Sequence, residues 1–197
     1  MHPYVIDSNE RVRIVLWISM IAVLLAWGIG QSQEKFNFII PWWFDAPSVL
    51  GFFGLLYKLV DCYLWKIPIL QKIGFFKTPD LNGKWITYIN SSHDDYSQNI
   101  SANVTIKQTW TRIVICLNGS QSSSTSRIAS ILVENSGQTL LSYEYMNQPN
   151  SNAPNTMHIH FGFTRLILSD DKRILSGDYY NGRGRANCGT LRLEKEN

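Results

Sequence analysis

Two long apolar stretches near the N-terminus constrain this chain more than any other feature of its sequence. The first, at residues 14–29, reads IVLWISMIAVLLAWGI and carries no charged side chain. With its neighbours it approaches the ~20 apolar residues that a helix needs to cross a bilayer. The second runs from about residue 49 to residue 70. We therefore predict a transmembrane hairpin over residues 1–77, with spans at residues 12–30 and 49–70.

Basic residues at the ends of the hairpin predict its orientation. Arg11 and Arg13 precede the first span, whereas Lys66, Lys72 and Lys77 lie at or beyond the end of the second. The loop between the spans holds a single lysine. The positive-inside rule then places both termini in the cytoplasm. A signal peptide is the alternative for the first stretch, but no small-residue cleavage motif follows it.

Two charged residues, Lys58 and Asp61, interrupt the second span. Residues three apart share one face of a helix and can pair. Charges inside a membrane span are costly and usually face protein or water. We therefore predict that Lys58 and Asp61 contribute to assembly of the transmembrane helices. The alternative is that Lys58 extends its ammonium group to the interface.

From about residue 81 the pattern of apolar residues changes to the period of two that is typical of β-strands. Eight strands are predicted, at residues 81–89, 99–107, 110–117, 124–133, 139–146, 156–168, 174–181 and 187–193. Eight short strands joined by short turns favour a closed up-and-down barrel over residues 78–197, with a sandwich as the alternative. The G-K-W at residues 83–85 resembles the G-x-W signature of lipocalin-type barrels. A barrel of this size has room for side chains or one small ligand.

The turns between the strands differ in length at the two ends of the predicted barrel. Successive turns of a meander alternate between its ends, and the turns at one end are mostly longer and polar. They are residues 90–98, 118–123, 147–155 and 182–186. The predicted strand at residues 81–89 begins next to the membrane, so these turns are expected to point away from the membrane. Functional loops are often the longer ones on a rigid scaffold, so we predict a ligand mouth at this end.

The charge of the predicted barrel excludes one class of ligand. From Asp80 onward there are 11 Lys and Arg against 10 Asp and Glu. A nearly neutral domain lacks the broad basic surface that binds duplex nucleic acid. An anionic ligand would have to be held by a few local cations.

The familiar catalytic motifs are missing from the sequence. We find no G-x-S-x-G, no P-loop and no H-E-x-x-H, so the sequence predicts a protein that is not an enzyme. His158 and His160 share a strand face and could approach Cys188, but no fourth metal ligand presents itself. We therefore predict no metal site and no cofactor.

The residues around the predicted mouth favour a small anionic ligand with aromatic rings. Arg183 and Arg185 lie in a glycine-rich turn and could clamp phosphate. Tyr143, Tyr145, Tyr179 and Tyr180 could stack on bases, and residues 122–127 add hydroxyls and a third cation, Arg127. The predicted ligand-binding residues are Ser126, Arg127, Tyr143, Tyr145, His160, Tyr180, Arg183 and Arg185. A solvated hairpin above a tyrosine-rich core is the alternative interpretation.

The layout of the whole chain resembles the two-transmembrane, β-strand-rich effectors of bacterial CBASS anti-phage systems, a class of CD-NTase-associated proteins. The resemblance rests on an ordered set of short motifs. They are L-N-G-K-W at 81–85, I-x-Q-x-W at 106–110, L-x-Y-x-Y at 141–145, H-x-G at 160–162 and L-S-G-D-Y at 175–179, followed by Arg185 and Gly189.

This resemblance implies a function. In the family a nucleotidyltransferase makes a cyclic oligonucleotide upon infection, the barrel binds it, the effector self-associates and the inner membrane is disrupted. The chain would then be a receptor for a cyclic dinucleotide and a homo-oligomer on activation, functionally linked to a cyclic-oligonucleotide synthase. It would be a multi-pass protein of the bacterial inner membrane, with its barrel in the cytoplasm. The competing interpretation is a membrane-anchored, lipocalin-like module that binds a lipid or another small molecule without killing activity.

Overall fold

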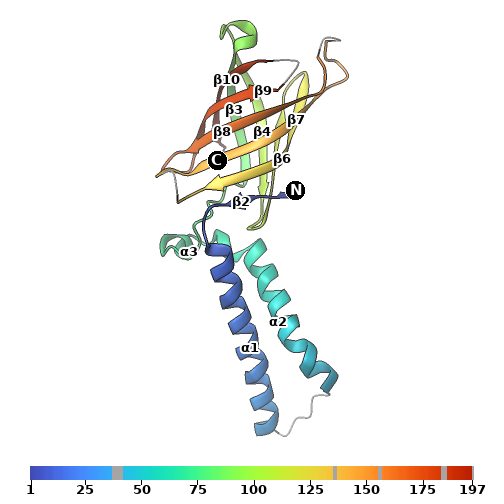
Figure 1. The fold of residues 1–197 in the computed structure, drawn as a ribbon, viewed down its shortest axis with the longest axis vertical. Coiled ribbons are helices and arrows are strands. Elements are labelled where there is room, and N and C mark those ends of the chain that lie inside the picture. The colour runs from blue at the N-terminus through green and yellow to red at the C-terminus, as the bar shows by residue number, and fades with distance from the viewer. Residues whose placement is uncertain (37–41, 135–136, 155–156, 183–185, 197) are drawn as a thin grey trace. The chain divides into compact units, whose positions relative to one another are not determined.

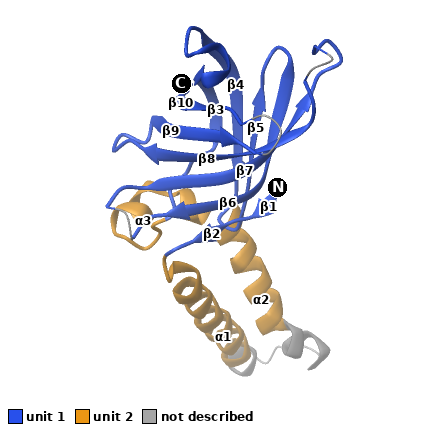
Figure 2. Ribbon diagram, turned by 45° about the horizontal axis from the view of Figure 1, so that its top comes forward, with its two compact units in different colours: residues 1–7, 78–197 blue, residues 8–77 orange. Residues whose placement is uncertain are grey.

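The computed structural model describes residues 1–36, 42–134, 137–154, 157–182 and 186–196. The chain forms two compact units, shown in different colours in Figure 2. One unit is residues 8–77, and the other is residues 78–197 together with residues 1–7. The second unit begins its main segment at Thr78. The first seven residues, however, group with the barrel and not with the helices as the sequence suggested.

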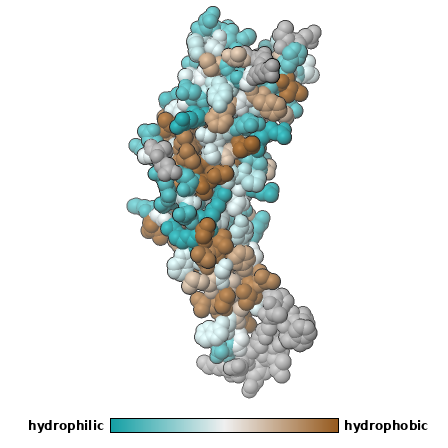
Figure 3. All heavy atoms as spheres, viewed as in Figure 1, coloured by the Kyte–Doolittle hydropathy of each residue, from teal (hydrophilic) through white to brown (hydrophobic). Residues whose placement is uncertain are grey.

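The helical unit is built on α1 (Glu10–Phe36) and α2 (Trp42–Cys62), which lie side by side in Figure 1. Two segments are long and apolar enough to cross a membrane: Glu10–Ser32 lies within α1, and Ser48–Lys66 begins in α2 and ends beyond it. Only 17% and 11% of these segments are buried within the protein. The hydrophobic side chains that they expose form much of the brown surface in Figure 3. An apolar helix surface of this extent is suited to lipid.

The second helix begins and ends earlier in the chain than the sequence predicted. It ends at Cys62 and is followed by a 3-10 turn, η1 (Leu64–Lys66), and a short helix, α3 (Pro68–Lys72). Proline disfavours helical backbone at the residue before it. Ile67 accordingly has extended backbone, with ψ 118°. The predicted span to residue 70 therefore contains a break.

The second unit is a closed eight-stranded antiparallel barrel, which confirms the predicted fold. Its strands are β3 (Gly83–Ser91), β4 (Asn99–Gln108), β5 (Arg112–Asn118), β6 (Ser122–Leu132), β7 (Leu140–Pro149), β8 (His160–Leu168), β9 (Ile174–Asn181) and β10 (Cys188–Lys195). Consecutive strands pair, β10 pairs with β3, and β5 pairs with β6. A short 3-10 turn, η2 (Ser92–Asp94), follows β3.

Two short strands at the N-terminus were not predicted. β1 (His2–Pro3) pairs with β5, and β2 (Val5–Ile6) pairs in parallel with β6. Figure 2 shows both in the colour of the barrel unit. Each has two residues, which is too short to display the period of two that identifies a strand in a sequence.

The end of the barrel where the chain enters β3 is filled with apolar side chains; we call it the closed end. Trp85 is fully buried there, and its indole N–H donates to the carbonyl oxygen of Leu81 at 3.1 Å. Other buried members of this cluster are Ile106, Ile113, Ile131, Leu141, Leu166, Leu175 and Leu193. Burial of this much apolar surface is the main source of stability for the barrel.

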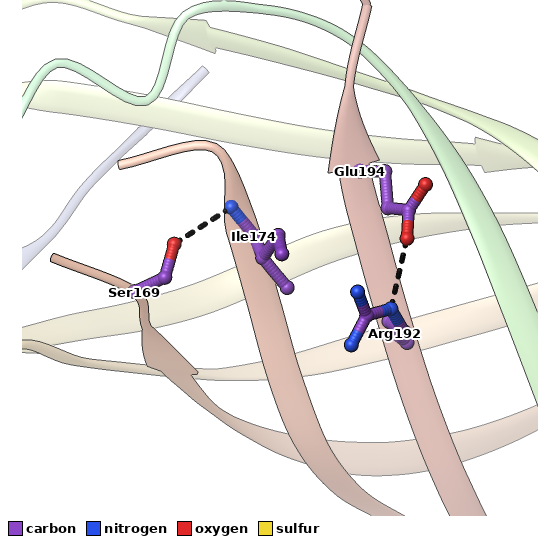
Figure 4. Close-up of polar contacts among 4 residues, drawn as sticks. All are labelled: Ser169, Ile174, Arg192 and Glu194. Atoms are coloured by element: carbon purple, nitrogen blue, oxygen red, sulfur yellow. Dashed lines mark hydrogen bonds and ion pairs between the residues drawn. The ribbon is translucent and has the colours of Figure 1, made fainter. Parts of the chain in front are cut away.

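Figure 4 shows two local polar contacts, one at the turn between β8 and β9 and one on β10. The Ser169 hydroxyl accepts from the Ile174 amide at 2.9 Å and so closes the turn between β8 and β9. On β10 the Arg192 Nε lies 2.9 Å from Glu194 Oε1. Both side chains of this pair are about half exposed, at 52% and 44%. An exposed ion pair contributes little to stability. The stability of the barrel therefore depends on its filled interior and not on this pair.

Candidate ligand-binding site

The other half of the barrel is hollow. A cavity of about 490 Å³ lies at the end formed by the turns after β3, β5, β7 and β9, which we call the mouth. Every one of the eight strands contributes at least one residue to its lining. The size falls in the range that is usual for small-molecule sites. The mouth is the end at which the turn lengths predicted a ligand site.

The inward-facing residues change in character along each strand from the closed end to the mouth. On β7 the series is Leu141, Tyr143, Tyr145 and Asn147, and all four are buried. Alternate residues of a strand face the same side, so this series follows one line along the barrel interior. Its polarity rises towards the mouth, where hydrogen bonds to a ligand can form.

A cluster of neutral polar groups lies on β6 and β7 beside the cavity. The Asn147 amide Nδ2 donates to the hydroxyls of Ser122 and Ser124, at 3.0 and 2.8 Å. Asn147 is only 7% exposed, and its Oδ1 has no partner among the described residues. A buried acceptor without a partner costs about 1–3 kcal/mol. A ligand N–H group at this position would remove that cost.

A second polar contact joins β7 to β9, and it passes over the strand between them, β8. The Tyr145 hydroxyl donates to Asn181 Oδ1 at 2.8 Å. The Tyr145 ring occupies the space above Gly162 on β8, where a Cβ atom would come within 2.3 Å of the ring. The ring of Tyr145 thus fills the space that a side chain at position 162 would occupy. The ring of Tyr143 follows at a centroid distance of 6.2 Å.

Burial changes the acidity of one of these phenols. Loss of contact with water raises the pKa of Tyr143 to about 12, and the neighbouring Thr164 opposes this shift. Tyr143 stays protonated at neutral pH and can donate a hydrogen bond to a ligand. A neutral phenol also adds no negative charge to a cavity that is to accept an anion.

Three of the predicted ligand-binding residues line the cavity. Tyr143 and Tyr145 project from β7, and His160 lies at the start of β8. His160 Nδ1 lies 3.0 Å from the carbonyl oxygen of His158. The structure thus brings two aromatic rings and an imidazole to one cavity.

Ser126 and Arg127 do not line the cavity. Ser126 is buried, and its Oγ accepts from the Ile115 amide at 2.9 Å within the barrel wall. The pairing of β6 with β7 shifts between Ser126 and Ile128, so Arg127 is the extra residue of a β-bulge. It is exposed on the outer face, where its guanidinium contacts the sulfur of Met146 at 3.7 Å. No residue at this point of the sequence indicates a bulge.

Tyr180 also lies elsewhere, because adjacent residues of a strand face opposite sides. Tyr179 faces the cavity, so Tyr180 faces outward and is 56% exposed. Its ring lies 5.5 Å from that of Phe163. The tyrosine that lines the cavity from β9 is therefore Tyr179.

Arg183 and Arg185 lie outside the described residues. The chain enters and leaves their turn at Asn181 and Asn187, which both line the cavity. Of the described lining residues, none is Lys or Arg, and Asp94 carries the only carboxylate. Within the same described set there is no group of three His, Cys, Asp or Glu residues that could hold a metal ion.

Several lining residues were missed from the sequence. They include Asn147 and Asn181. The signal was present, because Asn147 continues the alternation of Tyr143 and Tyr145, and Asn181 continues that of Tyr179. Extending the period of two to the strand ends would have found them.

Lys58 and Asp61 both lie on α2, as the sequence predicted. Lys58 is exposed, whereas Asp61 is half-buried. Neither the fold nor the comparisons below test their assembly role, which stays a prediction.

The fold and cavity define a class of protein: a small ligand-binding β-barrel carried on a membrane hairpin. Comparison with known proteins gives the family. A family model described as the Cap15 cyclic dinucleotide receptor domain matches residues 76–195, and one described as the Cap15 TM helices matches residues 12–66. The chain belongs to the Cap15 family, which confirms the resemblance seen in the sequence.

Two curated relatives carry the same name, CD-NTase-associated protein 15. The protein from Yersinia aleksiciae is 30% identical over 153 residues, which cover 77% of this chain and 71% of that protein. The protein from Staphylococcus schleiferi is 27% identical over 188 residues, covering 95% of this chain and 96% of that protein. The chain thus combines a cyclic dinucleotide receptor domain with transmembrane helices, as expected of a CBASS effector.

Proposed function

We propose that the hollow half of the barrel binds one cyclic dinucleotide and that binding activates a non-catalytic membrane effector of CBASS defence. The observation that carries the binding site is the buried, unpartnered Oδ1 of Asn147 at the cavity wall. The exocyclic amino group or ring N–H of a nucleobase would supply the missing donor.

The cavity lining offers both aromatic rings and hydrogen-bonding groups to a ligand. Tyr143, Tyr145 and Tyr179 offer faces on which a base can stack. Asn147 and Asn181 offer amides that can contact the edge of a base. A lipid site would be lined mainly by aliphatic side chains, so this lining favours the nucleotide.

The phosphates need cations that the described lining does not supply. We assign this role to Arg183 and Arg185, in the turn between the two lining residues Asn181 and Asn187. Arginine suits a phosphodiester because its planar guanidinium can donate two parallel hydrogen bonds. In this arrangement the bases enter the cavity and the phosphates remain near its mouth.

The effector part of the proposal rests on the helices. The apolar surfaces of α1 and α2 can pack against copies of the hairpin, and Lys58 and Asp61 would then reach charged or polar groups of a neighbour. Charges are tolerated in a bilayer when protein or water faces them. Assembled hairpins would permeabilise the inner membrane, with both termini and the barrel on the cytoplasmic side.

Binding is tested by thermal melts of the full chain in detergent with a panel of cyclic dinucleotides. A ligand at a hundredfold excess over its dissociation constant raises stability by about 2.7 kcal/mol. Asn147→Ala should reduce the melting shift, whereas Asn103→Ala, on the exposed face of β4, should not. A complete panel without any shift would overturn the receptor assignment.

Activation is tested by expressing the protein with a synthase that makes the bound dinucleotide. We expect a membrane-impermeant dye to enter only cells that contain both proteins. Cell death without dye entry would contradict the effector mechanism and point to a catalytic activity instead. Reporters fused after Asn197 and near Gln33 should report cytoplasm and periplasm, respectively.

A further inference from the structure

The N-terminal segment, residues 1–7, completes the barrel wall at a seam. β5 and β6 pair with each other at residues 116–118 and 123–125, near the mouth. Further from the mouth, β1 pairs with β5 through His2 and Pro3, and β2 pairs with β6 through Val5 and Ile6. The segment therefore lies between β5 and β6 and takes the place of a direct pairing. We call residues 1–7 the strap.

Two side chains anchor the strap: Tyr4, which is buried, and Asp7, at the C-terminal end of the strap. Tyr4 is 2% exposed, and its hydroxyl donates to the carbonyl oxygen of Trp110 at 2.8 Å. The Asp7 carboxylate accepts from the amides of Val133 and Glu134, at 2.7 and 3.1 Å. Hydrogen bonds to a charged group contribute more than neutral ones, so Asp7 holds the point where the strap leaves the barrel.

The strap also contacts a strand that lines the cavity. His2 Nε2 lies 2.8 Å from Ser126 Oγ, and that oxygen accepts from the Ile115 amide at 2.9 Å. The side chain of Ile115 lines the cavity, as does that of Leu117 two residues further along β5. A change in the position of β5 at the cavity therefore reaches the strap through this serine hydroxyl and through the pairing of β1 with β5.

One buried glutamine joins the strap to the second connection of the barrel with the helical unit. Gln108 is 3% exposed, and its Nε2 donates to the Tyr4 hydroxyl at 3.3 Å and to the Pro79 carbonyl oxygen at 3.2 Å. Its Oε1 accepts from the Leu81 amide at 2.9 Å. Gln108 thus contacts both segments of the barrel unit that lead to the helical unit.

The strap continues almost directly into the first membrane helix. Two residues, Ser8 and Asn9, separate Asp7 from Glu10, where α1 begins. The Arg13 amide already donates to the Asn9 carbonyl oxygen at 3.1 Å, so the helical hydrogen-bond pattern starts at Asn9. So short a spacer cannot absorb a displacement of the strap by more than a few ångströms.

We propose that the strap is the element that passes the ligand state of the cavity to α1. This inference rests on the proposed function, since it requires a cavity that binds a ligand. Ligand contact with β5 and β6 changes their spacing at the seam, the seating of the strap follows, and α1 moves with it. A ligand shifts such an equilibrium only by its different affinity for the two arrangements.

Coupling is reciprocal, which makes the strap accessible to measurement without a membrane assay. In hydrogen exchange on the full chain in nanodiscs, the amides of Tyr4, Val5 and Ile6 should change their protection when a bound cyclic dinucleotide is added. Unchanged exchange of these amides at a ligand concentration that saturates the cavity overturns the inference.

The decisive experiment lengthens the spacer. Insertion of Gly-Ser-Gly-Ser between Asp7 and Ser8 keeps every strap anchor but disconnects the strap mechanically from α1. The same insertion between Lys77 and Thr78 is the matched control, because it loosens the other connection. Binding is measured by calorimetry with the dinucleotide selected in the melts, and activation is measured by dye entry.

We expect the strap insertion still to bind the ligand, and to reduce dye entry by about 5- to 150-fold, the usual range of coupling between sites. The linker insertion should bind and permeabilise like the native chain. Dye entry that survives the strap insertion overturns the inference and leaves the proposed function intact. Equal loss in both variants also overturns it, since transmission would not be specific to the strap. Failure of the native chain to bind any cyclic dinucleotide would remove the proposed function and this inference together.

Discussion

The two halves of the barrel share strands, register and chain direction, yet one is solid and the other hollow. Towards the closed end the inward positions carry Trp85, Leu141 and Leu166, all buried. Towards the mouth the same strands carry Ser91, Asn147 and His160 around a cavity. The solid half supplies the burial that stabilises a small domain. The hollow half can then be polar, because the fold does not depend on it.

The largest expected effect is a loss of stability caused by a substitution in the solid half. Leu166→Ala removes a fully buried side chain of the closed end and should lower the free energy of unfolding by about 2–5 kcal/mol. Leu117→Ala, at the partly buried cavity wall, should cost much less because that site already adjoins empty space. Urea unfolding of the full chain in detergent measures both. Equal costs would mean that the halves do not differ as described.

The next effect concerns the cations at the mouth. Arg183→Ala and Arg185→Ala should each weaken binding of a cyclic dinucleotide about tenfold or more, since a hydrogen bond to a charged group contributes ~1.5–3 kcal/mol. The melting temperature without ligand should stay nearly constant. Arg165→Ala, on the exposed face of β8, is the control. Calorimetric titration at two salt concentrations checks the prediction, and native affinity in both mouth variants would place the phosphates elsewhere.

Gly162 tests the shape of the hollow half. Gly162→Ala places a Cβ atom against the Tyr145 ring and near Asn181 Oδ1, so the ring and its hydrogen bond must move. Such overpacking costs about 1–3 kcal/mol. We expect ligand affinity to fall as the cavity is reshaped, whereas Ser176→Ala on β9, exposed to solvent, should alter neither quantity. Unchanged binding by Gly162→Ala would show that Tyr145 does not shape the site.

The smallest effect appears only at high pH. Burial raises the pKa of Tyr143 to about 12, above the value near 10 of an unfolded chain. The folded state therefore keeps its proton longer, and this contribution to stability is complete below pH ~10 and is lost as the pH rises to about 12. Tyrosine absorbance during alkaline titration should show a phenol near pH 12 that Tyr143→Phe removes. A normal titration of every tyrosine would contradict the burial of Tyr143.

The comparison of the halves also explains what could be predicted from the sequence. The solid half depends on repeated alternation, so the strands of the barrel and both membrane segments were predicted to within a few residues. The hollow half depends on individual positions. Arg127 was wrongly assigned to the cavity because it lies in a β-bulge that no residue type indicates. Tyr180 was also assigned to the cavity, although it is its neighbour Tyr179 that faces it.

The strap was missed for a different reason. Two residues in each of β1 and β2 are held by a gap between strands that are distant in the sequence. The tie between Asp7 and the amides of Val133 and Glu134 spans more than a hundred residues. Local pattern carries no information about such a pairing, because tertiary context determines it.

The central claim, that the hollow half is the receptor site, is tested most directly by filling it. Ser124→Phe places a ring in the cavity from β6, and Thr125→Phe places the same ring on the outer face of the same strand. Calorimetric titration of the full chain with its cyclic dinucleotide should give one ligand per native chain. Binding should be lost in Ser124→Phe and retained in Thr125→Phe. Native affinity and stoichiometry in the folded Ser124→Phe variant would contradict the account.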